Sequence, residues 1–200
     1  MRAVALKAWT YEEWITANYA RAQSLMHQIY GHQVQETGHK TFGHSCVTEE
    51  DKAVAAASKA SLLYGELLPR GVNAALSPER LDAGNARTVF DLGMGTGKVP
   101  IQTFLQFPNL SLVRGVEIST GRFAVAERAA LDLVRLLPDE FEVQNHVPGR
   151  KIVVGSQPAK SLKDNGSRRL ELICGDMLDT AQIDEADIVM IETEVSGTSV

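Results

Sequence analysis

The segment Thr88–Gly97 restricts the possible folds of this chain more than any other. It reads Thr-Val-Phe-Asp-Leu-Gly-Met-Gly-Thr-Gly, so an apolar, β-branched run leads through an acidic residue to three glycines at alternate positions. Apolar residues with helical spacing begin directly after the last glycine. The pattern predicts a strand, a tight turn and a helix, with glycine wherever the backbone takes positive φ or a ligand approaches closely. The N–H groups at the start of that helix would point at the ligand.

The glycine spacing of this loop bears on the cofactor that it binds. The dinucleotide fingerprint G-x-G-x-x-G requires glycine at position 98, where this chain has Lys98. Asp91 lies two residues before Gly93 and produces an acidic-x-G-x-G-x-G loop instead. This form resembles motif I of methyltransferases that use S-adenosyl-L-methionine (SAM). The loop alone leaves SAM, a nicotinamide nucleotide and a purely structural glycine turn open.

Two carboxylates downstream of the loop indicate a nucleoside ligand. The predicted second strand, Ser111–Val116, ends at Glu117, which lies 20 residues beyond the third glycine. A βαβ unit places a carboxylate there to accept hydrogen bonds from ribose hydroxyls. The third predicted core strand, Leu170–Cys174, leads to Asp176 and Met177. That carboxylate can accept a hydrogen bond from an adenine amino group, and the apolar side chain can cover the ring.

The expected fold is α/β and Rossmann-like. Residues 81–200 are expected to form the nucleoside-binding domain, with Ala186–Ile191 as its fourth core strand, and residues 1–80 an N-terminal helical segment. A stretch at about 139–169 rich in glycine and proline is expected to be an insertion, with Ile152–Val154 as a possible extra strand.

Helix signals are clear in the N-terminal segment. Thr10 and Glu13 fit a capping box at the start of a helix that Gly31 ends. Thr48 is expected to cap a second helix, and Pro69 to begin a third. The Tyr64-Gly65-Glu66 turn precedes Pro69 and the glycine loop.

Histidines are frequent between the first two predicted helices. Their spacing matches neither a helical pair of zinc ligands nor a C-x₂-C knuckle, so no metal site is predicted. The residues concerned are His27, His32, His39, His44 and Cys46.

Composition limits which partners and which cellular compartment are expected. The formal net charge is −5, so no overall basic field attracts nucleic acid or an anionic membrane. The start of the chain lacks the apolar core of a secretory signal, and no apolar run is long enough to span a bilayer. Cys46 and Cys174 are the only cysteines and are not expected to form a disulfide. We therefore expect an intracellular protein without a membrane partner.

One local basic stretch is the exception. Six basic residues lie between positions 150 and 169, with Asp164 as the one acidic residue among them. They are Arg150, Lys151, Lys160, Lys163, Arg168 and Arg169. A phosphate or nucleic-acid contact and an ordinary solvated loop are the two interpretations.

Four stretches together resemble the disruptor-of-telomeric-silencing (Dot-one) family of non-SET histone lysine methyltransferases. They are the turn at 64–66 with the Leu-Pro that follows, the loop 91–102, Gly115–Glu117, and Gly175 with Asp176. The Tyr-Gly-Glu turn is the most specific, because it marks this family and not methyltransferases in general. The resemblance extends over about 60–194. It implies SAM as cofactor, a histone or nucleosome as protein substrate, and a nuclear location; without it the protein is expected in the cytoplasm.

The resemblance also implies roles for individual residues. Tyr64 and Glu66 would hold the methionine end of SAM, with the Glu66 carboxylate facing its ammonium or sulfonium charge. Glu117 would bind the ribose hydroxyls, and Asp176 with Met177 the adenine. The loop residues that would line the methionine end are Asp91, Gly93, Gly95 and Gly97.

The end of the fourth strand departs from the family. The family has two asparagines and an aromatic residue there, whereas this chain has Glu192-Thr193-Glu194. Glu192 and Glu194 are the candidate catalytic residues, although a carboxylate that attracts a cationic lysine also favours its protonated, non-nucleophilic form. Three hypotheses follow: a protein-lysine methyltransferase, a methyltransferase with a non-histone or small-molecule acceptor, and an inactive SAM-binding or interaction module.

The number of strands raises a second question. Sheets of this methyltransferase type have seven strands, but only four core strands fit before Val200. The sheet is therefore expected to be incomplete at its C-terminal side, in a truncated chain or with its edge completed by a partner.

Overall fold

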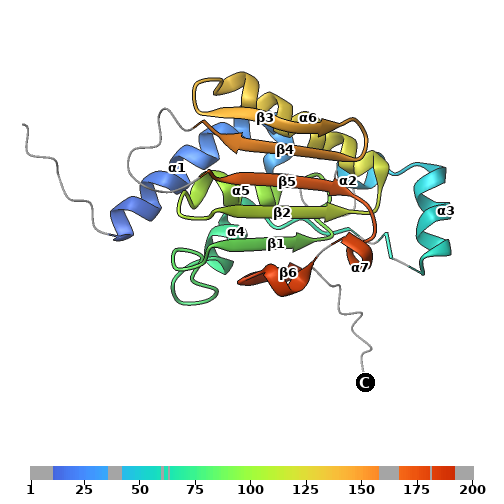
Figure 1. Cartoon of the computed structure of the whole chain (residues 1–200), viewed down its shortest axis with the longest axis horizontal. Helices are drawn as coiled ribbons and strands as arrows, with labels where there is room; N and C mark the ends of the chain where they lie inside the picture. The colour runs from blue at the N-terminus through green and yellow to red at the C-terminus, as the bar shows by residue number, and fades with distance from the viewer. Residues whose placement is uncertain are drawn as a thin grey trace, which may run out of the picture.

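A mixed six-stranded sheet forms the centre of the protein in the computed structural model, which describes residues 11–35, 42–59, 61–62, 64–157, 167–180 and 182–191 (Figure 1). In spatial order the strands are β3 (Phe141–Val147), β4 (Lys151–Ser156), β5 (Arg169–Cys174), β2 (Leu112–Glu117), β1 (Thr88–Leu92) and β6 (Ile188–Ile191). Strands β5, β2, β1 and β6 are parallel, whereas β3 and β4 form an antiparallel hairpin that pairs with β5.

The order of the parallel strands is compatible with a Rossmann-like fold. Counted along the chain, their spatial order is 3-2-1-4. The predicted α/β class is therefore confirmed, and all four predicted core strands are present.

The stretch predicted to be an insertion contributes two strands to the sheet. Ile152–Val154 lies within β4, as predicted, but β3 was not predicted. Nearly every residue of β3 is exposed, and glutamate, glutamine, asparagine and histidine dilute its apolar residues. Such a strand has little local signal, because its stability comes from pairing with β4.

Arg168 has a structural role within the predicted basic stretch. Its guanidinium donates hydrogen bonds to the carbonyls of Phe104 and Leu110, the latter at 3.2 Å, and lies 4.4 Å from the centroid of the Phe104 ring. It therefore satisfies carbonyl groups at the end of a helix and in the loop that follows. Lys160 and Lys163 lie outside the described residues.

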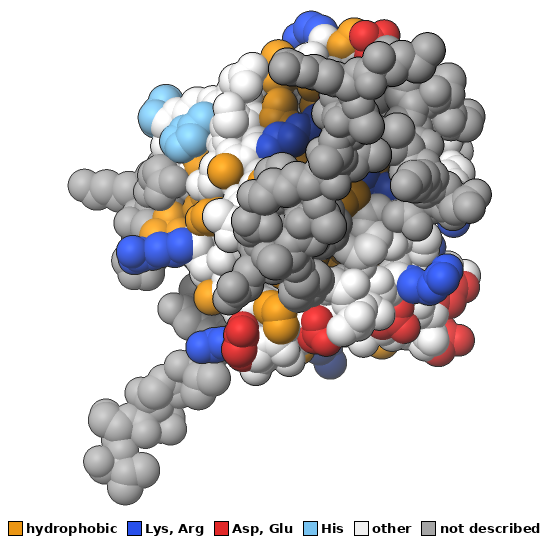
Figure 2. All heavy atoms as spheres, turned by 90° about the vertical axis from the view of Figure 1, so that its left-hand side faces the viewer, with side chains coloured by type: hydrophobic (Ala, Val, Ile, Leu, Met, Phe, Trp, Pro, Cys, Tyr) orange, Lys and Arg blue, Asp and Glu red, His pale blue; other side chains and the backbone are white. Residues whose placement is uncertain are grey.

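The other basic residues of the stretch lie at the surface. Lys151 and Arg169 extend toward Glu171, at 3.9 and 3.8 Å, and Arg150 is exposed in the β3–β4 turn. On the face that Figure 2 turns to the viewer, the described lysine and arginine side chains lie apart from one another. The phosphate contact remains a prediction.

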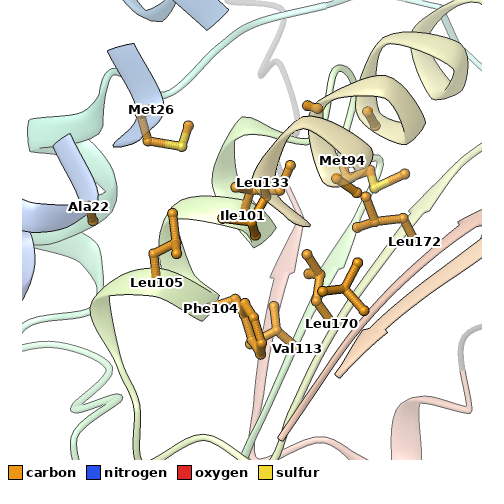
Figure 3. Close-up of a cluster of buried hydrophobic side chains, with 14 of the residues drawn as sticks. Ala22, Met26, Met94, Ile101, Phe104, Leu105, Val113, Leu133, Leu170 and Leu172 are labelled. Atoms are coloured by element: carbon orange, nitrogen blue, oxygen red, sulfur yellow. The ribbon is translucent and has the colours of Figure 1, made fainter. Parts of the chain in front are cut away.

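Helices cover one face of the sheet. They are α1 (Tyr11–Tyr30), α4 (Pro69–Ala75), α5 (Lys98–Gln106) and α6 (Thr120–Leu136). Helix α1 packs against α5, and α5 and α6 pack on the strands. Figure 3 shows this core, in which Ala22 and Met26 of α1 and Leu105 of α5 belong to the same buried cluster as Val113 and Leu170 of the sheet.

The opposite face of the sheet has a smaller apolar cluster. Phe90 and Leu92 of β1 pack there with Leu112 and Val116 of β2. The short elements α7 (Met177–Thr180) and η3 (Ile183–Glu185) lie between β5 and β6 in the chain.

Most of the predicted helix boundaries are confirmed. Helix α1 ends before Gly31, which has φ of +59° and begins η1 (Gly31–Gln35). Thr48 caps α3 (Glu49–Ala57) in a complete capping box, and Pro69 begins α4. Thr10 lies outside the described residues. The short helix α2 (Phe42–Ser45), in the histidine-containing stretch, was not predicted.

Within the described part of the chain, none of the helices combines the length and the hydrophobicity that crossing a bilayer requires.

Asp51 joins the N-terminal segment to α6. Its carboxylate accepts hydrogen bonds from Thr48 N at 2.9 Å, from Ser119 Oγ at 2.9 Å and from Thr120 N at 2.7 Å. Burial alone would raise the pKa of Asp51, but the hydrogen bonds from Thr48, Thr120 and Ser119 outweigh it and hold the pKa well below its usual value. One buried carboxylate thus caps two helices from distant parts of the chain.

We expect Asp51→Ala to lower the free energy of unfolding by about 2 to 4 kcal/mol near neutral pH, because several charge-assisted hydrogen bonds are lost together. Since the pKa of Asp51 is lowered by folding, the difference from the parent is complete above about pH 4 and shrinks on further acidification. Urea unfolding over a pH series measures this difference in the free energy of unfolding. The exposed neighbour Glu50→Ala serves as control, with an expected change within about 0.5 kcal/mol; a similar loss in both variants would contradict the assignment.

Candidate functional site

A pocket of about 270 Å³ lies at the carboxyl ends of β1 and β6. After β1 the chain passes through α5 to β2 on one side, whereas β6 lies on the other side of β1. Neighbouring parallel strands with diverging connections leave a crevice at their carboxyl ends, which is where open α/β sheets bind ligands. The walls of the pocket come from the turn at 64–67, the glycine loop, the start of α5 and the end of β6.

The ring of Tyr64 forms one wall. It fits between Gly43 of α2 and Gly95 of the glycine loop, because a Cβ atom on either glycine would overlap the ring. The guanidinium carbon of Arg122 lies 4.3 Å from the ring centroid, and the His44 ring meets it edge-on at 5.5 Å. Three segments of the chain therefore hold this ring in place.

The Tyr64 hydroxyl connects the turn to the loop. It donates a hydrogen bond to the Glu66 carboxylate and accepts one from Thr96 N at 3.3 Å. Thr96 Oγ1 donates to the same carboxylate at 3.0 Å. Burial, together with the charge of Glu66, raises the pKa of Tyr64 far above its usual value, so the phenol remains neutral.

Lys98, the first residue of α5, forms a buried ion pair with Glu66. The residue is 8% exposed, and its ammonium group also donates to the carbonyl of Gln33 in η1. In the same region the hydroxyl of Tyr30, at the end of α1, donates to the Thr96 carbonyl at 3.0 Å. The N-terminal segment thus supports the glycine loop and the base of the pocket.

The pocket contains charges of both signs. Glu66 and Asp91 provide two carboxylates, and Lys98 provides one ammonium group. Asp91, on β1, is 7% exposed. Buried charges of this kind are costly unless they are paired, and Glu66 and Lys98 pair with each other.

Glu117 lies behind the glycine loop at the end of β2. It is 3% exposed and does not line the pocket. Its carboxylate accepts hydrogen bonds from Gly95 N and Ser119 N, both at 2.8 Å. Burial raises the pKa of Glu117, while the hydrogen bond from Ser119, the charge of Arg122 and the hydrogen bond from Gly95 oppose the rise.

Asp176 and Met177 lie beside the exposed side of the loop. Asp176 Oδ1 accepts a hydrogen bond from Leu178 N at 2.9 Å at the start of α7. The Met177 methyl group is 4.0 Å from where a Cβ on Gly93 would lie. These residues border the loop outside the pocket.

The structure brings part of the predicted site together. Tyr64, Glu66, Asp91 and Gly93 line the pocket, whereas Gly95 supports it from behind. Gly97 has a packing role, because a Cβ there would lie 2.7 Å from the Cβ of Ala126 on α6. Glu192 and Glu194 lie outside the described residues, so their role remains a prediction.

Several residues of the site were not predicted from the sequence. Thr96 and Lys98 lie next to the glycines and could have been found by asking which side chains follow the loop. Arg122, Tyr30 and Gln33 have no local signal, because they reach the site from other elements.

The histidine-containing stretch does not assemble a metal site in the described part of the chain. No group of three or more histidine, cysteine, aspartate or glutamate side chains is suitably placed among those residues. Cys46 and Cys174 are free and half-buried, and His39 lies outside the described residues.

No protein-family model matches the chain, and no curated protein matches it.

Gly95→Ala and Gly93→Ala test the position of the Tyr64 ring. Both glycines have positive φ, at +57° and +88°, so alanine costs about 1 to 2 kcal/mol at either position. Only at Gly95 does the added methyl also collide with Tyr64, so we expect this variant to lose about 1 to 3 kcal/mol more in urea unfolding. Equal losses would show that the ring is not held against the loop.

Proposed function

We propose that the protein is a SAM-dependent methyltransferase that transfers a methyl group to a protein lysine, as its resemblance to the Dot-one family implies. The proposal is supported above all by the pocket that the glycine loop lines. Two carboxylates and one ammonium group line this pocket at the carboxyl ends of β1 and β6. This position is where an open α/β sheet binds a nucleoside cofactor.

The charges of the pocket suit the amino-acid end of SAM. That end has an ammonium and a carboxylate group, with a sulfonium nearby. Glu66 and Asp91 complement the two cations, and Lys98 complements the carboxylate. The pyrophosphate of a nicotinamide dinucleotide has only negative charges and would face both carboxylates, which argues against NAD.

The residues beyond the pocket suit the nucleoside end. Each oxygen of Glu117 accepts one N–H group and so retains capacity for a ribose hydroxyl. Gly93 lies exposed between this region and the pocket, with Met177 at its side. In the proposed arrangement SAM extends from Glu66 over Gly93 toward Glu117 and Asp176.

When bound, SAM supplies an electrophilic methyl group whose sulfonium leaves as a neutral thioether. The chain therefore needs no acid for the leaving group, and its contribution is to align and desolvate the reacting groups. Leu81, Val189 and Ile191 form an apolar side of the pocket, next to which the acceptor would lie. A desolvated lysine amine favours its neutral, nucleophilic form and releases its proton to solvent before transfer.

The acceptor is the part of the proposal that rests most on the resemblance. Glu192 and Glu194 directly follow the apolar end of β6 and remain the candidate residues that meet a cationic lysine. A histone or nucleosome is the proposed substrate, with the nucleus as the location that this substrate implies.

Calorimetry and a transfer assay test the function. We expect SAM and S-adenosylhomocysteine to bind and NAD not to bind. Labelled methyl transfer is then measured on nucleosomes, free histones and a cell lysate, and we expect label on lysine of a histone. Binding of NAD without SAM would refute the cofactor; label on another acceptor would keep the cofactor and refute the histone; SAM binding without any transfer would indicate an inactive binding module.

Two variants separate the ends of the cofactor. Glu117→Ala should weaken the binding of S-adenosylhomocysteine and of its decarboxylated analogue equally, by about 1 to 3 kcal/mol, since both compounds have the same ribose. Lys98→Gln, which keeps a hydrogen-bond donor near Glu66, should abolish the preference for the compound with the carboxylate, which we expect to be about tenfold or more in the parent. Equal effects of Lys98→Gln on both compounds would contradict the assignment of Lys98.

A further inference from the structure

Arg122 contacts both ends of the proposed cofactor site. It lies in the first turn of α6 and is 3% exposed. Its guanidinium carbon is 4.3 Å from the centroid of the Tyr64 ring, and Nη1 is 4.0 Å from Glu117 Oε1. Tyr64 belongs to the wall of the pocket and Glu117 to the end of β2, so this single side chain connects them.

The same guanidinium also donates hydrogen bonds to two backbone carbonyls near the Tyr64 ring. Nη2 donates a hydrogen bond to the Leu62 carbonyl at 2.7 Å, just before the turn. Nε donates to the Gly43 carbonyl at 2.9 Å, on the helix that lies against the other edge of the Tyr64 ring. Rigid, directed donors of this kind are the particular property of arginine.

We propose that Arg122 is a positioning residue whose charge faces Glu117 and whose guanidinium holds Tyr64 in place, so that the nucleoside and methionine ends of the site form together. The proposal deepens the proposed function and rests on it, because the ionisation of Glu117 affects binding only when a ribose lies at the end of β2.

The physical basis is the burial of Glu117. Burial favours the neutral carboxylic acid and so raises the pKa of Glu117; the positive charge of Arg122 opposes this. Among the described residues, the titratable groups that interact with Glu117 include Asp51 of α3, Cys46 after α2 and Cys174 of β5. Asp51 is negative and raises the pKa further, while the two thiols, whose own pKa values are raised, stay neutral.

The sign of the pH effect follows. An ionised Glu117 can accept hydrogen bonds from two ribose hydroxyls, whereas its protonated form loses acceptor capacity and adds a competing donor. Affinity for a ribose should therefore fall as the pH drops through the raised pKa of Glu117. Without the charge of Arg122 this fall should begin at a higher pH.

Three variants distinguish this role from a purely structural one. Arg122→Met removes the charge and the donors; Arg122→Lys keeps the charge but not the fixed directions of the donors. Leu133→Ala, in the apolar core on the same helix, destabilises the protein without touching the site. Calorimetry with S-adenosylhomocysteine over a series of pH values is the measurement for each variant.

As the pH is lowered, we expect the affinity of Arg122→Met for S-adenosylhomocysteine to begin its fall at a higher pH than that of the parent. Arg122→Lys should bind more weakly than the parent at every pH but show the parent's pH dependence. Leu133→Ala should lower only the thermal midpoint. If Arg122→Met retains the parent's pH dependence, or Arg122→Lys shows an enlarged one, the proposal is overturned; the second criterion holds even if the methionine variant does not fold.

A second readout works without a ligand. The carboxyl carbon resonance of Glu117, assigned by comparison with Glu117→Gln, should titrate at higher pH in Arg122→Met than in the parent. An unchanged titration would overturn the proposal. Failure of the parent to bind S-adenosylhomocysteine would count against the proposed function, while this titration would still decide the role of Arg122.

Discussion

The packing of the Tyr64 ring between two glycines from distant parts of the chain is the constraint on which the candidate site depends. Gly43 belongs to the N-terminal segment and Gly95 to the loop after β1, and neither position has room for a Cβ. Because the hydroxyl of the same residue binds Glu66 and Thr96, the ring also fixes the carboxylate in the pocket. The pocket wall therefore exists only when the helical segment and the sheet are assembled together.

The site also contains two buried pairs of opposite charges. The side chains of Glu66 and Lys98 are 6% and 9% exposed, and Glu117 and Arg122 lie close together in a similarly buried position. Each ion costs several kcal/mol to remove from water, and apolar replacements of similar volume are often equally stable or more stable. In the proposed function both pairs have a role, with Glu66 and Lys98 at the amino-acid end of SAM and Glu117 at its ribose.

The sequence permitted the local parts of the site to be predicted, and the structure places four of them around one pocket. Tyr64 and Glu66 were found through the resemblance to a family motif, and Asp91 and Gly93 through the pattern of a strand followed by a glycine loop. Lys98 was noted only as a departure from the dinucleotide pattern, since nothing in its neighbourhood shows that its ammonium group reaches Glu66 and Gln33. Strand β3 was missed for a related reason: its polar, exposed residues become a strand by pairing with β4.

The sequence by itself determined the strand–loop–helix unit, the four parallel strands and most helix boundaries, because glycine conformations, capping residues and apolar periodicity act over a few neighbouring residues. Only the tertiary structure decided which side chains meet. Arg122 reaches Tyr64 and Glu117, and Asp51 caps a helix that begins 69 residues later, at Thr120. Such contacts depend on how α3 and α6 are oriented on the sheet, and that orientation is set by the packing of the whole core.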